Sequence, residues 1–223
     1  MQTIKSISIS NGVPASAYPL AAVVFVAMLK DAFEDYKRNK SDNEENFKAT
    51  KVFSKRTGDF EDVIWKDLKP GNIIKIYEDE AIPADICLLG SSDPKGSLYI
   101  ETKNLDGETN LKNKFIHKDI NEKFGMNVAA CGDLQGTIYC EAPNNAIYKF
   151  EGQFLQDGFD PVPLGADNII LRGCMLRNTE YVYGIVVFSG HDTKIMMNSM
   201  AAKYKFSGLE KYTNYAIMVV LIT

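Results

Sequence analysis

Residues 100–112 read IETKNLDGETNLK, and this stretch is the most informative part of the sequence. The Asp106-Gly107 pair predicts a tight turn, because glycine adopts backbone conformations that other residues avoid. The residues alone allow two interpretations of this turn. In the first, Glu108 simply faces water on an exposed loop. In the second, Gly107 lets the loop approach a partner closely, while Glu108 and Thr109 project toward a reacting group, where a carboxylate can orient and deprotonate a water molecule.

Short apolar runs, divided by glycine, proline and asparagine, extend on both sides of this turn. The candidate strands are residues 62–65, 73–77, 86–89, 98–102, 137–140, 148–155, 169–171 and 181–188. The sequences KPGN and DPKG, at residues 69–72 and 93–96, are typical of turns between strands. Many short strands at close spacing predict a small β-sandwich or distorted barrel. After the last strand, Asp192 is predicted to cap a helix that runs through Met200 and Ala201.

Before the first candidate strand, residues 31–51 are rich in charged side chains that favour helices. Glu34 and Arg38 are four positions apart, a spacing that supports an exposed helix. Ser41 and Glu44 also match a capping box, which would end one helix and start another. One continuous helix with Ser41 on its surface fits the sequence equally well, so both alternatives stay open.

Charge is distributed unevenly along the chain. Apart from Lys5, every Lys, Arg, Asp and Glu lies between Lys30 and Lys211. Residues 18–29 read YPLAAVVFVAML inside a longer uncharged stretch, which is long enough to cross a bilayer as a helix. A signal peptide fits less well, because basic residues follow the apolar run instead of preceding it, and no small-residue cleavage site is present. We therefore expect a transmembrane helix at residues 18–29.

A second apolar run, YTNYAIMVVLIT, occupies residues 212–223. It is too short to span a bilayer alone and is expected to begin another transmembrane helix that this sequence cuts off. Basic residues follow the first apolar run and precede the second. Because positive charge favours the cytoplasmic side, we expect residues 30–211 to be cytoplasmic in a multi-pass membrane protein.

Composition and missing motifs argue against several functions. The chain of 223 residues carries 25 Lys and Arg against 29 Asp and Glu, without the dense basic stripe that nucleic-acid binding requires. The spacing of its four cysteines suits neither a zinc site nor a disulfide framework, so they are expected to be small buried side chains. No GxxxxGK[ST], GxGxxG or GxSxG motif is present. We therefore assign no cofactor-binding or metal-binding residue, and any nucleotide is expected to bind outside this sequence.

The sequence around the turn resembles the actuator region of P-type ATPases, and in particular that of the type IV subfamily, the phospholipid flippases. The tip DGET, residues 106–109, stands where cation pumps typically have TGES. The similarity continues in EDYKRNKSDNEEN at residues 34–46, in PADICLLGSSDPKGSLYIET at residues 83–102 and in LRGCMLRNTEYVYGIVVFSGHDTKIMMN at residues 171–198. It therefore covers nearly the whole chain and is far more specific than the four tip residues.

The resemblance implies a mechanism and a role for each tip residue. In such pumps ATP with Mg2+ phosphorylates an aspartate in a DKTG motif on a separate domain, and the actuator then rotates until its tip reaches the aspartyl phosphate. By this resemblance Glu108 orients the attacking water, Thr109 and Asp106 support it near the phosphate, and Gly107 permits the close approach. The step is coupled to movement of a phospholipid toward the cytoplasmic leaflet.

The same resemblance implies the fold class and the domain organisation. The fold class is an α+β membrane protein fragment, with a mainly β actuator domain, a small distorted sandwich or jelly roll, between helical stalks that lead to transmembrane helices. The expected segments are an extracytoplasmic loop (1–17), a transmembrane helix (18–29), a helical stalk (30–60), the β-rich actuator domain (61–190), a second helical stalk (191–211) and a truncated transmembrane helix (212–223).

The sequence lacks the DKTG motif, the nucleotide-binding domain and most of the membrane helices of such pumps. It is therefore expected to be a piece of a longer protein and to be inactive alone. The implied partners are a phospholipid, the phosphorylation and nucleotide-binding domains of the same protein, and a glycosylated accessory subunit. Two alternatives stay open: the actuator of a cation-transporting P-type ATPase, and a membrane-tethered, β-rich binding module without catalysis.

Overall fold

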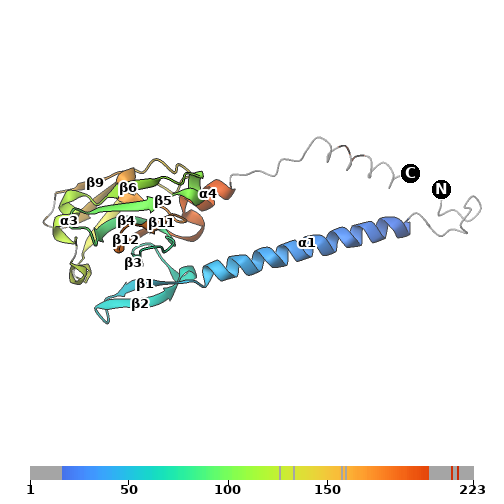
Figure 1. Ribbon diagram of the computed structural model, residues 1–223, viewed down its shortest axis with the longest axis horizontal. Coiled ribbons are helices and arrows are strands. Elements are labelled where there is room, and N and C mark those ends of the chain that lie inside the picture. Colours follow the sequence, from blue (N-terminus) through green and yellow to red (C-terminus); the bar gives the residue numbers. More distant parts are fainter. Residues whose placement is uncertain are drawn as a thin grey trace, which may run out of the picture. The chain divides into compact units, whose positions relative to one another are not determined.

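The computed structural model describes residues 17–125, 127–132, 134–156, 158, 160–200, 212 and 215. The chain divides into two compact units, one made of residues 1–45 and 203–223 and the other of residues 46–202. A long helix, α1 (Ala17–Asn46), represents the first unit, and the second is built mainly of strands (Figure 1). The predicted β domain is confirmed, with wider limits than the predicted 61–190.

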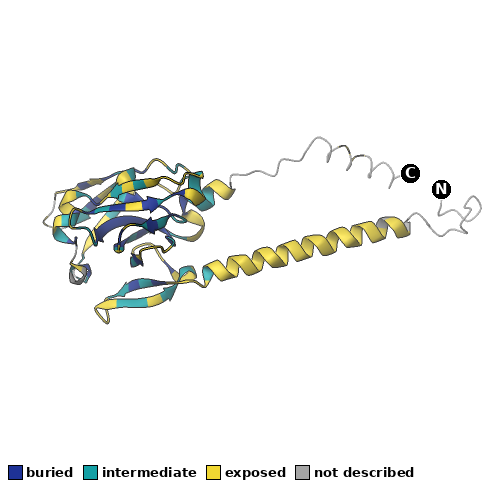
Figure 2. Ribbon diagram, in the orientation of Figure 1, coloured by how far each residue is buried: buried dark blue, intermediate teal, exposed yellow. Residues whose placement is uncertain are grey.

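Helix α1 continues through Ser41 without a break, which decides between the two alternatives left open above. Exposed ion pairs one turn apart support it, with Lys30 Nζ 3.2 Å from Glu34 Oε1 and Lys40 Nζ 3.9 Å from Glu44 Oε1. Its side chains are exposed along almost the whole length, the apolar ones of its first half included (Figure 2). Within the described part of the chain, no helix combines the length and the apolar character needed to cross a membrane.

The predicted helical stalk at residues 30–60 is wrong beyond Asn46. The chain there forms a hairpin of β1 (Ala49–Ser54) and β2 (Asp59–Ile64), closed by Gly58 with φ +71°. Phe53 and Phe60 face each other across it, with ring centroids 5.5 Å apart. Many of the charged side chains here point to water from a sheet surface, and a charged stretch of this kind is easily taken for an exposed helix.

The largest sheet has six antiparallel strands in the order β10-β4-β12-β3-β1-β2. Its remaining strands are β3 (Ile73–Tyr77), β4 (Asp85–Ser91), β10 (Ile169–Ile170) and β12 (Tyr181–Phe188). Strands β3 and β12 begin and end where they were predicted, because both are runs of β-branched and aromatic residues. Strand β4 is buried along its whole length, so this sheet forms the centre of the domain.

Two smaller antiparallel sheets complete the domain. One contains β11 (Met175–Arg177), β5 (Ser97–Glu101) and β6 (Leu111–Phe115), and the other contains β7 (Gly136–Cys140), β8 (Gly152–Gln156) and β9 (Val162–Leu164). Strands β1, β6, β9 and β11 were not predicted. Short or alternating polar strands such as β6, which reads LKNKF, carry too little apolar sequence to stand out. The predicted strand at residues 148–155 begins only at Gly152.

Short helical segments connect the strands or follow the last of them. They are α2 (Lys103–Asp106), α3 (Lys118–Lys123), α4 (Lys194–Met200) and the 3-10 turns η1 (Trp65–Asp67), η2 (Val128–Cys131), η3 (Ala166–Asn168) and η4 (Gly190–Asp192). The predicted cap at Asp192 is wrong, because Asp192 belongs to η4 and the helix begins at Lys194. Helix α4 lies at the start of the predicted stalk 191–211. The rest of that stalk, residues 1–16 of the predicted loop, and all of the second apolar run except Tyr212 and Tyr215 lie outside the described residues.

The core is closely packed around β4 and β12. Tyr183 is fully buried, and its hydroxyl donates to the backbone oxygens of Phe124 and Gly125, each 2.5 Å away. A Cβ on Gly90 would lie 2.0 Å from the Gly125 oxygen, so only glycine fits there.

All four cysteines are free thiols. Cys87, Cys131 and Cys174 are buried, as predicted, and Cys140 is exposed, which corrects the expectation for that residue.

Candidate functional site

The DGET residues lie at the end of the β5–β6 hairpin. Glu101 and Leu111 form the last pair of the ladder, and the loop between them, residues 102–110, begins with the single turn of α2 (Figure 1). Gly107 ends that turn with φ +77°, and its N–H donates to the Lys103 oxygen at 3.1 Å. The left-handed conformation explains the glycine, since other residues adopt it at a cost. The predicted tight turn is therefore confirmed.

The Asp106 carboxylate points back into the loop. Thr102 Oγ1 donates to it at 2.9 Å, the Glu108 N–H at 3.0 Å and the Tyr148 hydroxyl at 3.2 Å, and Lys112 Nζ lies 2.5 Å from Oδ2. The side chain is only 8% exposed. Although its partial burial opposes ionisation, the hydrogen bonds from Lys112, the Glu108 N–H and Thr102 hold the pKa of Asp106 at about 2, below its ordinary 3.8. Asp106 thus fixes the backbone that carries Glu108.

Glu108 points outward, with 56% of its side chain exposed, and Thr109 beside it is also exposed. The Glu108 carboxylate makes an ion pair with Lys112, its Oε2 lying 3.0 Å from Nζ. The structure thus places the four predicted residues on one loop. Asp106 is turned inward, whereas Gly107, Glu108 and Thr109 are exposed. This arrangement can present one carboxylate to a group that approaches from outside.

Lys112 and Tyr148 complete the site and were missed by the sequence analysis. The Lys112 ammonium contacts both carboxylates and lies 5.3 Å from the centre of the Tyr148 ring. Its hydrogen bond to Asp106 is the largest cause of its raised pKa. The spacing of four between Glu108 and Lys112 was a usable signal for the lysine. Tyr148 arrives from a loop far along the chain, and only the fold brings it here.

Behind the loop lies a small pocket of about 50 Å³, lined by Thr102, Leu105, Asp106 and Lys112 among others. Lys114 also faces it and donates from Nζ to the Ala166 oxygen at 2.6 Å, and burial lowers the pKa of this lysine. A space of this size suits water molecules. Among the described residues, no group of three or more His, Cys, Asp and Glu side chains is placed to hold a metal ion.

A second polar cluster fixes the start of α4. Asp85, fully buried at the beginning of β4, accepts the backbone N–H of Arg172 through Oδ1 and that of Lys194 through Oδ2, both at 2.8 Å. Burial raises the pKa of this carboxyl group against the effect of the two donors. The first N–H of α4 is therefore satisfied from the central sheet and not by Asp192.

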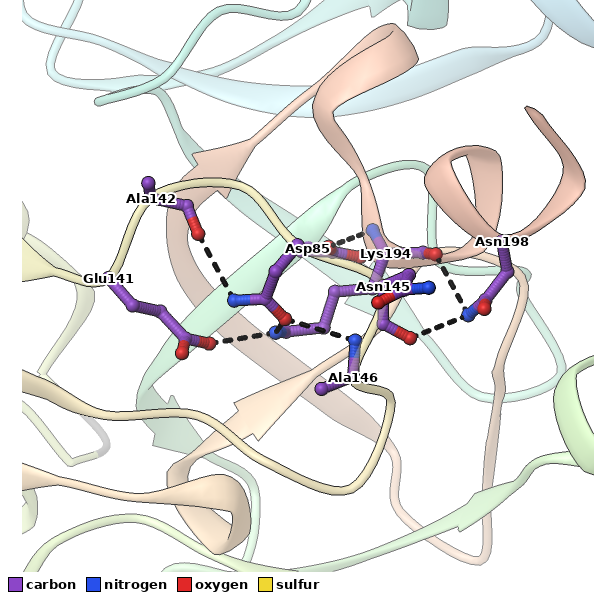
Figure 3. A network of polar contacts seen from close by, with 8 residues as sticks. Asp85, Glu141, Ala142, Asn145, Ala146, Lys194 and Asn198 are labelled. Atoms are coloured by element: carbon purple, nitrogen blue, oxygen red, sulfur yellow. Dashed lines mark hydrogen bonds and ion pairs between the residues drawn. The ribbon is translucent and has the colours of Figure 1, made fainter. Parts of the chain in front are cut away.

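The same cluster holds the loop that carries Tyr148. Lys194 Nζ, also fully buried, donates to Glu141 Oε1 and Asn144 Oδ1, each at 2.8 Å, and Asn198 Nδ2 donates to the Asn145 oxygen at 2.9 Å (Figure 3). One end of residues 141–151 is thus attached to α4. Tyr148, farther along the same loop, reaches Asp106 at the candidate site.

Comparison with known proteins agrees with this architecture. The sequence profile of the P-type ATPase actuator domain matches residues 45–197. The chain is 39% identical over 209 residues to the phospholipid-transporting ATPase DRS2 of Saccharomyces cerevisiae, covering 91% of this chain and 15% of that protein. It is 40% identical over 206 residues to phospholipid-transporting ATPase 1 of Arabidopsis thaliana, covering 92% of this chain and 17% of that protein.

A third relative, phospholipid-transporting ATPase IC of Xenopus tropicalis, is 39% identical over 222 residues, covering 100% of this chain and 17% of that protein. The chain therefore spans less than a fifth of the length of each of these relatives. The profile match covers most of the β domain, including the β5–β6 hairpin with the DGET loop. This chain contains a P-type ATPase actuator domain and belongs to the type IV, phospholipid-transporting family of these enzymes.

Proposed function

We propose that this chain is the actuator segment of an ATP-driven phospholipid translocase, and that its DGET loop hydrolyses an aspartyl phosphate formed on another domain of the same protein. The observation that carries the proposal is the outward Glu108 carboxylate on a loop whose backbone Asp106 fixes from within. Enzymes that transfer phosphoryl groups gain most of their rate from positioning and electrostatics, which is what a rigid loop of this kind can supply.

In the proposed step, Glu108 accepts a hydrogen bond from a water molecule and takes its proton as the water oxygen bonds to phosphorus. The bond between phosphorus and the aspartyl oxygen breaks, leaving an aspartate carboxylate and inorganic phosphate. Thr109 follows Glu108 in the sequence and is also exposed, so it is available to the phosphate. Gly107 keeps the tip free of a side chain that would hold the phosphate away.

The remaining assignments rest on the family. ATP and Mg2+ would bind to domains outside this chain, and hydrolysis would be coupled to phospholipid movement toward the cytoplasmic leaflet. Residues 18–29, which include exposed apolar side chains such as Val23 and Phe25 on α1, would lie in the membrane. Residues 30–211 would be cytoplasmic and residues 212–223 would begin the next membrane helix. A glycosylated accessory subunit would be a further partner.

Asp106 favours this function over the actuator of a cation pump. Its carboxylate accepts from Thr102, Glu108 and Tyr148 and pairs with Lys112, and a threonine at this position could not receive all four donors. The third alternative, a tethered binding module without catalysis, requires no outward carboxylate at the tip.

The test uses an actuator chimera, in which residues 45–197 of this chain replace the corresponding residues of the full-length yeast relative. Phosphoenzyme is formed with labelled ATP and its decay is followed after a chase. We expect the unmodified chimera to hydrolyse its phosphoenzyme and Glu108→Gln to slow the decay by about 10²–10⁴-fold, because the base is lost. Decay at the unmodified rate in E108Q, or an unmodified chimera that forms phosphoenzyme and never hydrolyses it, would overturn the proposal. In the full-length protein that contains this chain, ATPase activity stimulated by an ion and indifferent to lipid would favour the cation pump.

A further inference from the structure

The tip of the loop combines two carboxylates with one ammonium group. Lys112 Nζ lies between the acids, 2.5 Å from Asp106 Oδ2 and 3.0 Å from Glu108 Oε2. Among the described residues, no other cation lies within ion-pair distance of either carboxylate. These three side chains together carry a single negative charge, and they would carry twice that charge without the lysine.

Lys112 is held in place from several sides. It pairs with Ile100 across β5 and β6, so its backbone belongs to the ladder and not to the loop. Its side chain is 29% exposed, and the ring of Tyr148 lies over the ammonium group at 5.3 Å. The strand and the aromatic ring already restrict this lysine. It therefore loses less side-chain entropy when it pairs with the two carboxylates than an unrestrained surface lysine would.

This charge balance matters for the proposed function, on which the inference rests. An aspartyl phosphate is anionic, so a tip that brings two carboxylates to it meets like-charge repulsion, which grows as the closing domains exclude water. Glu108 must also present its carboxylate in one direction, since small errors of placement slow a positioned reaction strongly.

We infer that Lys112 is a positioning residue for hydrolysis of the aspartyl phosphate. Its ammonium group holds the Glu108 carboxylate in the direction of attack, and it offsets the negative charge that Asp106 and Glu108 bring to the phosphate. Lys112 acts through these two acids and takes no part in bond making or breaking.

The actuator chimera tests this role with Lys112→Met, which keeps the length of the side chain and removes its charge. We expect K112M to form phosphoenzyme like the unmodified chimera, and its phosphoenzyme to decay about 10–100-fold more slowly, because Glu108 is no longer held.

Lys112→Arg should restore most of the rate. Lys149→Met is the matched control: Lys149 is exposed, is a neighbour of Tyr148 in the sequence, and pairs with neither carboxylate among the described residues, so K149M should decay at the unmodified rate.

A second measurement separates positioning from stability. Thermal unfolding of each variant, measured in parallel, shows whether a slow rate follows a loss of stability.

E108Q separates failure of this inference from failure of the proposed function. If E108Q retains its phosphoenzyme and K112M hydrolyses it at the unmodified rate, the inference is wrong and the proposed function stands. If E108Q decays at the unmodified rate, the proposed function is wrong. K112R as slow as K112M, with an equal loss of thermal stability in both variants, would make Lys112 a structural residue and overturn the inference.

Discussion

At the scale of single residues, Asp106 and Glu108 show how two neighbouring acids take different tasks. Asp106 is nearly buried and receives hydrogen bonds from three donors besides Lys112, while Glu108 remains exposed. The family resemblance implies a place for Asp106 beside the phosphate. The contacts place it inside the loop, where it orders the backbone of Glu108.

Asp106→Asn should destabilise the chain in a pH-dependent way. The pKa of Asp106 is about 2 in the folded protein and ordinarily 3.8, so the ionised carboxylate stabilises the fold above about pH 4. That contribution is lost as the pH falls toward about 2. We expect D106N to lower the free energy of unfolding by about 1–2 kcal/mol at pH 7, as is usual for hydrogen bonds to a charged group.

Urea unfolding of both proteins at pH 7, 4 and 2 checks this expectation. The difference between wild type and D106N should shrink as the pH falls through this range. Asp67→Asn, an exposed aspartate with no hydrogen bond to its side chain among the described residues, is the control and should leave the stability unchanged at each pH. A difference for D106N that stays constant from pH 7 to pH 2 would contradict the assigned role.

Substitutions of Gly107 can separate its role in the backbone conformation from its proposed role in close approach to the phosphate. Alanine at φ +77° should cost about 1–2 kcal/mol of stability, whereas asparagine tolerates this conformation better. A Cβ at this position meets no atom of the domain within 4 Å. We therefore expect Gly107→Asn to fold almost as stably as wild type, and to hydrolyse the phosphoenzyme slowly in the actuator chimera. Normal hydrolysis by G107N would show that close approach does not need a glycine.

At the scale of elements, the loop of residues 141–151 connects two polar clusters. It begins at Glu141, which pairs with buried Lys194 of α4, and it carries Tyr148 to the Asp106 carboxylate. Asp85 fixes the first N–H of α4 from the central sheet. The position of the candidate site therefore depends on contacts between segments far apart in the sequence.

Lys194→Ala should destabilise the domain strongly. The lysine side chain is fully buried and its partner Glu141 is 25% exposed, so removing the cation leaves a partly buried carboxylate and a cavity. We expect the free energy of unfolding, measured with urea, to fall by about 3 kcal/mol. This is the lower end of the loss expected when a buried ion pair is broken, because water can reach Glu141. Lys118→Ala removes an exposed pair with Glu122 and should cost less than about 1 kcal/mol. Equal losses for the two variants would contradict the structural role of Lys194.

The elements that could be predicted from the sequence are those with strong local patterns. Strands β3 and β12 are apolar, β-branched runs bounded by turns, and the DGET tip carries its own turn signal. Strands β1 and β6 could not be found in this way, because their exposed faces carry charged residues and their register depends on neighbouring strands. Tyr148 and the inward turn of Asp106 depend on tertiary contacts, which local patterns do not encode.

At the scale of the whole molecule, the chain contains an actuator domain of the P-type ATPase family. Its β domain has a core of its own, and its fold presents the DGET loop on a hairpin that two polar clusters support. In the proposed function, the partner of this loop is an aspartyl phosphate on another domain. That function depends on one geometric claim, that Glu108 reaches the water that attacks this phosphate.

A structure of the actuator chimera with aluminium fluoride, which mimics the phosphoryl group during hydrolysis, tests that claim most directly. The proposed function predicts that the Glu108 carboxylate lies at a hydrogen-bond distance of about 3 Å from the attacking water, and that this water lies in line with the aspartyl oxygen. A structure in which another side chain holds that water, while Glu108 faces away from the phosphate, would contradict it.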